Sequence, residues 1–179
     1  MTSPILEACL LILPAVIGGG IHMAVVRLNL LSRWTVPVNR ALFGANKTWR
    51  GFVVMPLACT LGVMATALLE RAWNRPSVFD HENLALVGIL LGLAYCLGEL
   101  PNSYLKRRLG IPPGQTLPGY RFLTLICDHL DSLLGCLVVY VLLLGTGPAA
   151  ALWILVLGPL VHIAVNLGLY AAGLRREAF

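Results

Sequence analysis

The chain has 179 residues, of which 58% are hydrophobic and only 12% charged, and its mean hydropathy is +0.83. This composition is more apolar than a soluble domain needs to fill its core. It argues against an ordinary soluble domain and indicates a protein whose solvent is lipid.

Five mostly apolar segments, each about 20 residues long, are long enough to cross a bilayer. In chain order they cover residues 5–26, 52–69, 84–100, 123–145 and 149–172. Unpaired backbone groups are costly in lipid, so the segments should be helices. The first segment is too long for the apolar core of a signal peptide and is expected to be a retained span. We therefore predict an all-α, polytopic membrane helix bundle in which residues 1–179 form a single domain.

The basic residues are distributed unevenly between the predicted loops. Eleven of the thirteen lie before the second span, between the third and fourth, or after the fifth: Arg27, Arg33, Arg40, Lys47, Arg50, Lys106, Arg107, Arg108, Arg121, Arg175 and Arg176. Only Arg71 and Arg75 lie on the opposite side. By the positive-inside rule the N-terminus is outside and the C-terminus cytoplasmic. The net charge of +5 is then mostly topology and does not indicate nucleic-acid binding.

A first polar motif, residues 43–51, directly precedes the second span. Gly44 and Gly51 allow close backbone approach to a ligand, and the motif also carries two cations and a hydroxyl. With the free amides at a helix start, Lys47, Thr48 and Arg50 could surround phosphate oxygens. The alternative is a glycine turn with Trp49 and flanking cations at the membrane interface.

A second motif, residues 98–108, ends the third span. If the helix continues past Pro101, then Glu99, Ser103 and Lys106 share one face. That face would offer a carboxylate, a hydroxyl and a cation. The alternative is a helix end with an ordinary basic flank.

A third motif, residues 128–132, enters the fourth span. Asp128 and Asp131 project from one face of a helix that is already apolar, where each charge costs about 2.5–3.5 kcal/mol. A divalent cation would offset both charges. The alternative is that both aspartates flank a helix whose buried part begins at Leu133.

The cysteines and most histidines carry no recognisable pattern. The five cysteines are scattered through apolar stretches and are expected to be buried packing residues: Cys9, Cys59, Cys96, Cys127 and Cys136. Three histidines are isolated and are expected to be packed or interfacial: His22, His81 and His162. His129 is left unassigned.

Together the three ordered motifs resemble those of the CDP-archaeol synthase family, within the wider group of membrane CTP:phosphatidate cytidylyltransferases. The motifs are Asn46 to Gly51, Ser103 to Gly110 and Asp128 to Asp131, and the resemblance covers about residues 37–140. It implies transfer of CMP from CTP to a lipid phosphate, archaetidic acid-like or phosphatidate-like, with Mg²⁺ required. The products would be a CDP-lipid and pyrophosphate.

The resemblance also implies roles for individual residues. Those with catalytic roles would be Lys47, Lys106, Asp128 and Asp131. Those contacting substrate would be Asn46, Thr48, Arg50, Ser103 and Arg107. The metal would be held by Asp128, Asp131 and Glu99. The chain departs from the family at Gly98-Glu99, where Gly-Asp is usual, and at Asn39, where Pro-x-Asp is common.

The implied partners are CTP, a membrane lipid phosphate and the bilayer, with the active site facing the cytoplasm from the cell (inner) membrane; homodimerisation is left open. One alternative is a non-catalytic scaffold or lipid-binding protein with degenerate motifs, which the departures at Glu99 and Asn39 would suit. A CDP-alcohol phosphotransferase would need a longer aspartate-rich helix pair. A transporter would be expected to show mid-membrane polar residues and repeat symmetry.

Overall fold

The structure is a computed structural model that describes residues 3–79, 82–113, 115 and 121–173. Within these ranges it is helical and has no strand, only an isolated bridge between Pro37 and Thr48. The elements are α1 (Pro4–Arg27), η1 (Ser32–Trp34), α2 (Arg40–Phe43), α3 (Trp49–Ala72), α4 (Leu84–Arg108), α5 (Arg121–Leu144) and α6 (Pro148–Ala171). The all-α prediction is confirmed.

The five long helices α1, α3, α4, α5 and α6 are each long and apolar enough to cross a membrane. They correspond to the five predicted spans, so the polytopic bundle is confirmed. The largest boundary difference is in α4, which continues to Arg108 instead of ending near residue 100. The additional turns are polar, and hydropathy detects only the part of a helix that is apolar.

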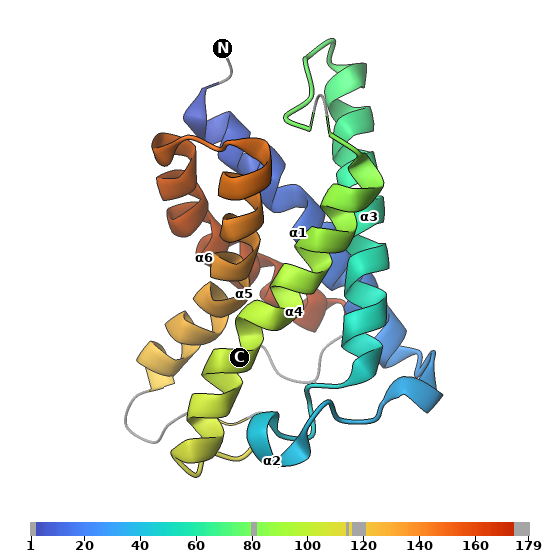
Figure 1. The fold of residues 1–179 in the computed structure, drawn as a ribbon, viewed down its shortest axis with the longest axis vertical. Helices are drawn as coiled ribbons and strands as arrows, with labels where there is room; N and C mark the ends of the chain where they lie inside the picture. Colours follow the sequence, from blue (N-terminus) through green and yellow to red (C-terminus); the bar gives the residue numbers. More distant parts are fainter. Residues whose placement is uncertain (1–2, 80–81, 114, 116–120, 174–179) are drawn as a thin grey trace.

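The bundle has two distinct ends. At one end lie the N-terminus of α1 and the connection from α3 to α4; at the other lie α2 and the C-terminal end of α4 (Figure 1). The first and second polar motifs are therefore at the same end. Which end faces the cytoplasm stays a prediction from the charge distribution. His81, Arg175 and Arg176 lie outside the described residues.

The most extensive interfaces are those of α3 with α4, α4 with α5 and α1 with α3, while α6 packs less extensively against α1 and α5. Glycines allow α4 to approach both of its neighbours. A Cβ added at Gly88 would lie 2.2 Å from Thr60 Cα, and one at Gly92 would lie 2.4 Å from Pro56 Cα. On the α5 side, a Cβ at Gly98 would lie 2.5 Å from the carbonyl oxygen of Asp131. The helix that carries the second motif is thus held between α3 and α5.

The segment between α1 and α3 folds back on itself. The amide of Val38 donates to the carbonyl of Lys47 at 2.8 Å, and the amide of Trp49 donates to the carbonyl of Val36 at 3.0 Å. These two bonds surround the Pro37–Thr48 bridge and return the first motif to the start of α3.

The cysteine prediction is correct for three residues and wrong for two. Cys59, Cys96 and Cys136 are buried, whereas Cys9 and Cys127 are exposed. The exposed pair lie on apolar helices with one face outside the bundle, and a thiol is apolar enough for that position. Burial could not be inferred from an apolar neighbourhood alone because the whole chain is apolar.

The packing of α4 predicts a sharp difference between two glycine substitutions. Gly92→Ala would place a methyl group against the backbone of α3 and should destabilise the protein by about 1–3 kcal/mol. Gly168→Ala is the matched control, since its Cβ would meet nothing within 4 Å. Thermal unfolding in detergent, followed by size-exclusion chromatography, measures both; equal midpoints for the two variants would contradict the close approach.

Candidate functional site

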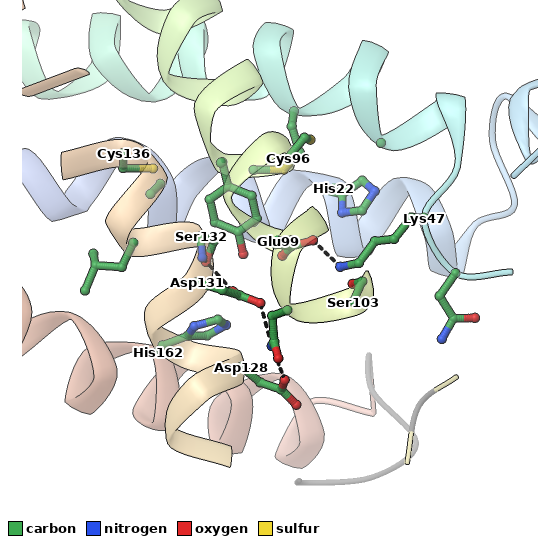
Figure 2. Close-up of a pocket in the computed structure, with 18 of the residues that line it drawn as sticks. His22, Lys47, Cys96, Glu99, Ser103, Asp128, Asp131, Ser132, Cys136 and His162 are labelled. Carbon is green, nitrogen blue, oxygen red and sulfur yellow. Dashed lines mark hydrogen bonds and ion pairs between the residues drawn. The ribbon is translucent and has the colours of Figure 1, made fainter. Parts of the chain in front are cut away.

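A cavity of about 500 Å³ opens between the long helices and extends to the end that carries the first and second motifs. Nine of the ten predicted site residues line it: Asn46, Lys47, Thr48, Glu99, Ser103, Lys106, Arg107, Asp128 and Asp131. The motifs are up to 85 positions apart in the chain, from Asn46 to Asp131. Their convergence on one cavity makes this the candidate active site (Figure 2).

Lys47, just before α3, forms an ion pair with Glu99 on α4 in the lining of the cavity (Figure 2). The Lys47 Nζ donates to Glu99 Oε2, and each side chain is about a quarter exposed, at 25% and 24%. Burial lowers the pKa of the Lys47 ammonium while the Glu99 carboxylate raises it, and the net pKa is above its ordinary value. Glu99 therefore stabilises the cationic form of this lysine.

The two aspartates face α4 through a shared partner. Asn102 Nδ2 donates to Asp128 Oδ1 at 2.7 Å and to Asp131 Oδ2 at 2.9 Å. Lys106 Nζ lies 2.6 Å from the Asp128 carboxylate. The expectation that both aspartates lie on one helix face is confirmed, because a single amide reaches both.

Asn102 was missed as a site residue in the sequence. A signal was present, because Asn102 lies three residues after Glu99 and four before Lys106, on the same face of α4. The continuous helix across Pro101 brings this whole face into the cavity.

The aspartate pair fits a divalent cation. One atom, Asn102 Nδ2, already lies within 2.9 Å of an oxygen from each carboxylate, so a single cation could bridge the pair. Mg²⁺ is usually held by one or two carboxylates together with substrate phosphates. Among the described residues no group of three or more His, Cys, Asp or Glu side chains is arranged to hold a metal. Glu99, the third predicted ligand, is bound to Lys47.

Arg107 is a cation whose donors are not all used. Its Nε and Nη1 are buried and have no hydrogen-bond partner within the described part of the chain, yet the residue lines the cavity. Gly44 leaves room for it, since a Cβ there would lie 3.3 Å from Arg107 Nη1. Leaving buried charged donors unpaired is costly, so the position favours an anionic ligand.

Arg50 differs from the other predicted substrate-binding residues. It is 9% exposed, does not line the cavity, and its Nη1 donates to the carbonyl of Leu30 at 3.3 Å. This position ties the segment after α1 to the start of α3. Thr48, by contrast, lines the cavity, and its hydroxyl does not cap α3.

Two histidines that were expected to be packed or interfacial line the cavity. His22 comes from α1 and lies beside Lys47, and His162 comes from α6 on the side of the aspartates (Figure 2). Asn166, one turn after His162, also lines the cavity and is 8% exposed. No spacing within the sequence could reveal them, because each reaches the site from a helix that carries none of the three motifs.

A family model described as CarS-like, CDP-archaeol synthase, matches residues 4–179. The chain belongs to the CDP-archaeol synthase family. The chain is 33% identical over 152 residues to the CDP-archaeol synthase of Methanosphaerula palustris, covering 80% of this chain and 83% of that protein. It is 31% identical over 178 residues to that of Pyrococcus furiosus, covering 93% of each chain. No solved structure matches the chain.

Membership of the CDP-archaeol synthase family confirms the resemblance inferred from the three motifs. It makes the chain a CTP-dependent cytidylyltransferase that acts on a lipid phosphate. The relative from Pyrobaculum calidifontis, 31% identical over 180 residues, covers 98% of each chain, so the likeness includes all five helices.

The Lys47–Glu99 pair predicts a change in lysine reactivity. In Glu99→Gln the carboxylate that raises the pKa of Lys47 is lost while burial still lowers it, so this pKa should fall. Acetylation of Lys47 against pH, followed by mass spectrometry, should shift to lower pH because only the neutral amine reacts. Lys106, the other lysine in the chain, bonds to Asp128 and provides the internal reference. An unmoved Lys47 profile would refute the role of Glu99.

Proposed function

We propose that this cavity transfers CMP from CTP to a membrane lipid phosphate, archaetidic acid-like or phosphatidate-like, releasing pyrophosphate. The observation that carries the proposal is the placement of three cations, Lys47, Lys106 and Arg107, around one cavity with an aspartate pair. Both substrates are anions, so bringing them together requires concentrated positive charge.

The three cations would act in different ways. Lys47 and Lys106 are bound to carboxylates, and a phosphate oxygen can replace each carboxylate as the acceptor. Arg107 lines the cavity, its buried Nε and Nη1 have no partner among the described residues, and its planar guanidinium suits bidentate contact with a phosphate. Thr48, Ser103 and Asn46 would supply neutral contacts to the same substrates.

The reaction needs positioning more than it needs a strong base. A lipid phosphate oxygen attacks the α-phosphorus of CTP and forms a new P–O bond. The bond to the β-phosphate breaks, and its electron pair leaves with pyrophosphate. The cations hold the attacking and leaving oxygens in line and offset their charge. Mg²⁺, held by Asp128 and Asp131, would add positive charge at the phosphates when bound.

The location of the cavity supports a site at the cytoplasmic surface of the cell membrane. Its polar end lies with α2 and the C-terminal end of α4, which carries Lys106, Arg107 and Arg108 in its last turn. The positive-inside rule makes this end cytoplasmic. CTP is a cytoplasmic solute and a lipid phosphate sits at the same interface, so one membrane domain can reach both.

Turnover should depend on Arg107 and not on its neighbour. Purified protein is incubated with labelled CTP, Mg²⁺ and a panel of ether- and ester-linked lipid phosphates, and CDP-lipid is measured. Arg107→Gln should lower kcat/KM by about tenfold to a hundredfold, the worth of a charge-assisted hydrogen bond or two. Arg108→Gln should match the wild type, because Arg108 bonds to Tyr104 and does not line the cavity.

Absence of CDP-lipid with every acceptor would overturn the proposed activity and favour the non-catalytic alternative. Equal losses in Arg107→Gln and Arg108→Gln would leave general surface charge, and not this cavity, as the determinant.

Metal binding can be measured without turnover. Asp131→Asn should weaken Mn²⁺ binding, detected by electron paramagnetic resonance, by at least about tenfold, since it removes one of two carboxylates. Glu7→Gln is the control, because Glu7 lies in the first turn of α1, at the other end of the bundle. Unchanged Mn²⁺ affinity in Asp131→Asn would remove the pair from the metal site.

A further inference from the structure

The cavity changes character along its length. Its outer end is lined by the ion pairs, whereas its inner part reaches Tyr95, eleven residues before Lys106 on α4 and so about 16 Å deeper at 1.5 Å per residue. Apart from Tyr95 on α4 and Ser132 on α5, the inner lining is apolar or small and comes from α1, α3, α5 and α6: Ile12, Val16, Met55, Leu133, Cys136 and Gly158. The cavity therefore extends along α4 from its polar last turns into the apolar part of the bundle.

We propose that the inner part of the cavity holds one hydrocarbon chain of the lipid phosphate, and that Gly19 sets the room for that chain. The inference rests on the proposed function, because it assumes that the phosphate of the same lipid lies among Lys47, Lys106 and Arg107. A lipid phosphate joins an anion to an apolar chain, and the cavity joins a cationic end to an apolar end in the same order.

CTP does not suit the inner part. Its triphosphate, ribose and amino group all need hydrogen-bond partners, and polar groups buried without partners are costly. A hydrocarbon chain needs no hydrogen-bond partner. Each methylene that it buries contributes a similar favourable free energy of transfer from water. The apolar lining therefore selects the chain over the nucleotide.

Three consecutive glycines in α1 have three different surroundings. A Cβ at Gly18 would lie 2.7 Å from Cys59 Sγ, so this residue packs α1 against α3. Gly19 lines the cavity, and a Cβ there would meet nothing within 4 Å. Gly20 has the same open space but does not line the cavity. A glycine inside a helix lowers the stability of the helix. The absence of a side chain permits close helix packing at Gly18 and leaves space in the cavity at Gly19.

Gly19 lies at the boundary between the two parts of the cavity. One turn before it on α1 is Val16 in the apolar lining, and one turn after it is His22 beside the ion pairs. A larger side chain at Gly19 would close the inner part while leaving the cations in place. Gly20→Leu provides a control with the same change in composition and helix propensity.

The test compares Gly19→Leu, Gly19→Ala and Gly20→Leu in the full-length protein. With CTP saturating, Gly19→Leu should raise the KM for dioleoyl phosphatidate about tenfold or more, equivalent to about two methylenes excluded from an apolar site. Gly19→Ala should give a smaller rise. The increase should be smaller with dihexanoyl phosphatidate, and the KM for CTP should not change. Gly20→Leu should match the wild type.

Binding of dioleoyl phosphatidate, measured by native mass spectrometry, separates this inference from the proposed function. If neither the wild type nor any variant forms CDP-lipid, the proposed activity is wrong. The chain site is still supported if Gly19→Leu binds the lipid more weakly than the wild type and Gly20→Leu does not. If the wild type is active but both Gly19 variants keep its KM and lipid affinity, the chain site is overturned and the activity stands. If Gly19→Leu raises the KM for CTP and leaves the KM for the lipid unchanged, the inner part binds the nucleotide, and the chain site is also overturned.

Discussion

The close approach of α4 to α3 and α5 is the constraint on which the site depends. At Gly88 and Gly92 the backbone of α4 lies against that of α3, and at Gly98 it lies against α5 near Asp131. Van der Waals contact between backbones is a main source of helix association in lipid, where the hydrophobic effect is absent. The same contacts set the distance from α4 to the aspartates, so that one amide, that of Asn102, reaches both.

The Lys and Arg side chains that line the described cavity are paired with carboxylates, with one exception. Lys47 is paired with Glu99 and Lys106 with Asp128, which limits the cost of holding these groups beside apolar helices. Arg107 keeps buried donors without partners in the described structure. An anion in the cavity would meet one cation without a carboxylate partner, Arg107, and two that must exchange a carboxylate for it. The family assignment and this arrangement agree on an anionic substrate.

Hydropathy predicted the five spans because a helix that crosses lipid is mostly apolar over the length that crosses it. Helical spacing predicted the shared face of Glu99, Ser103 and Lys106. Both are local properties of the chain. The contributions of His22 and His162 were missed because they depend on how α1 and α6 pack against the other helices. Arg50 was predicted to contact phosphate because it is a cation of the first motif near a helix start, but the first turn of α3 directs it toward the carbonyl of Leu30. The same helical spacing places Asn102 on this face of α4, so its position could also have been predicted.

The fold of the segment before α3 has a consequence for how the site can respond to ligand. Backbone hydrogen bonds at Val38–Lys47 and Val36–Trp49 fix the chain on both sides of Thr48. Lys47 can then leave Glu99 by rotating its own side chain, with no unfolding of the segment that carries it. Ligand binding would not have to order this backbone, so little conformational entropy is lost there. The backbone of the first motif is therefore preorganised. Only the flexible side chain of Lys47 has to move when a ligand replaces Glu99 as its partner.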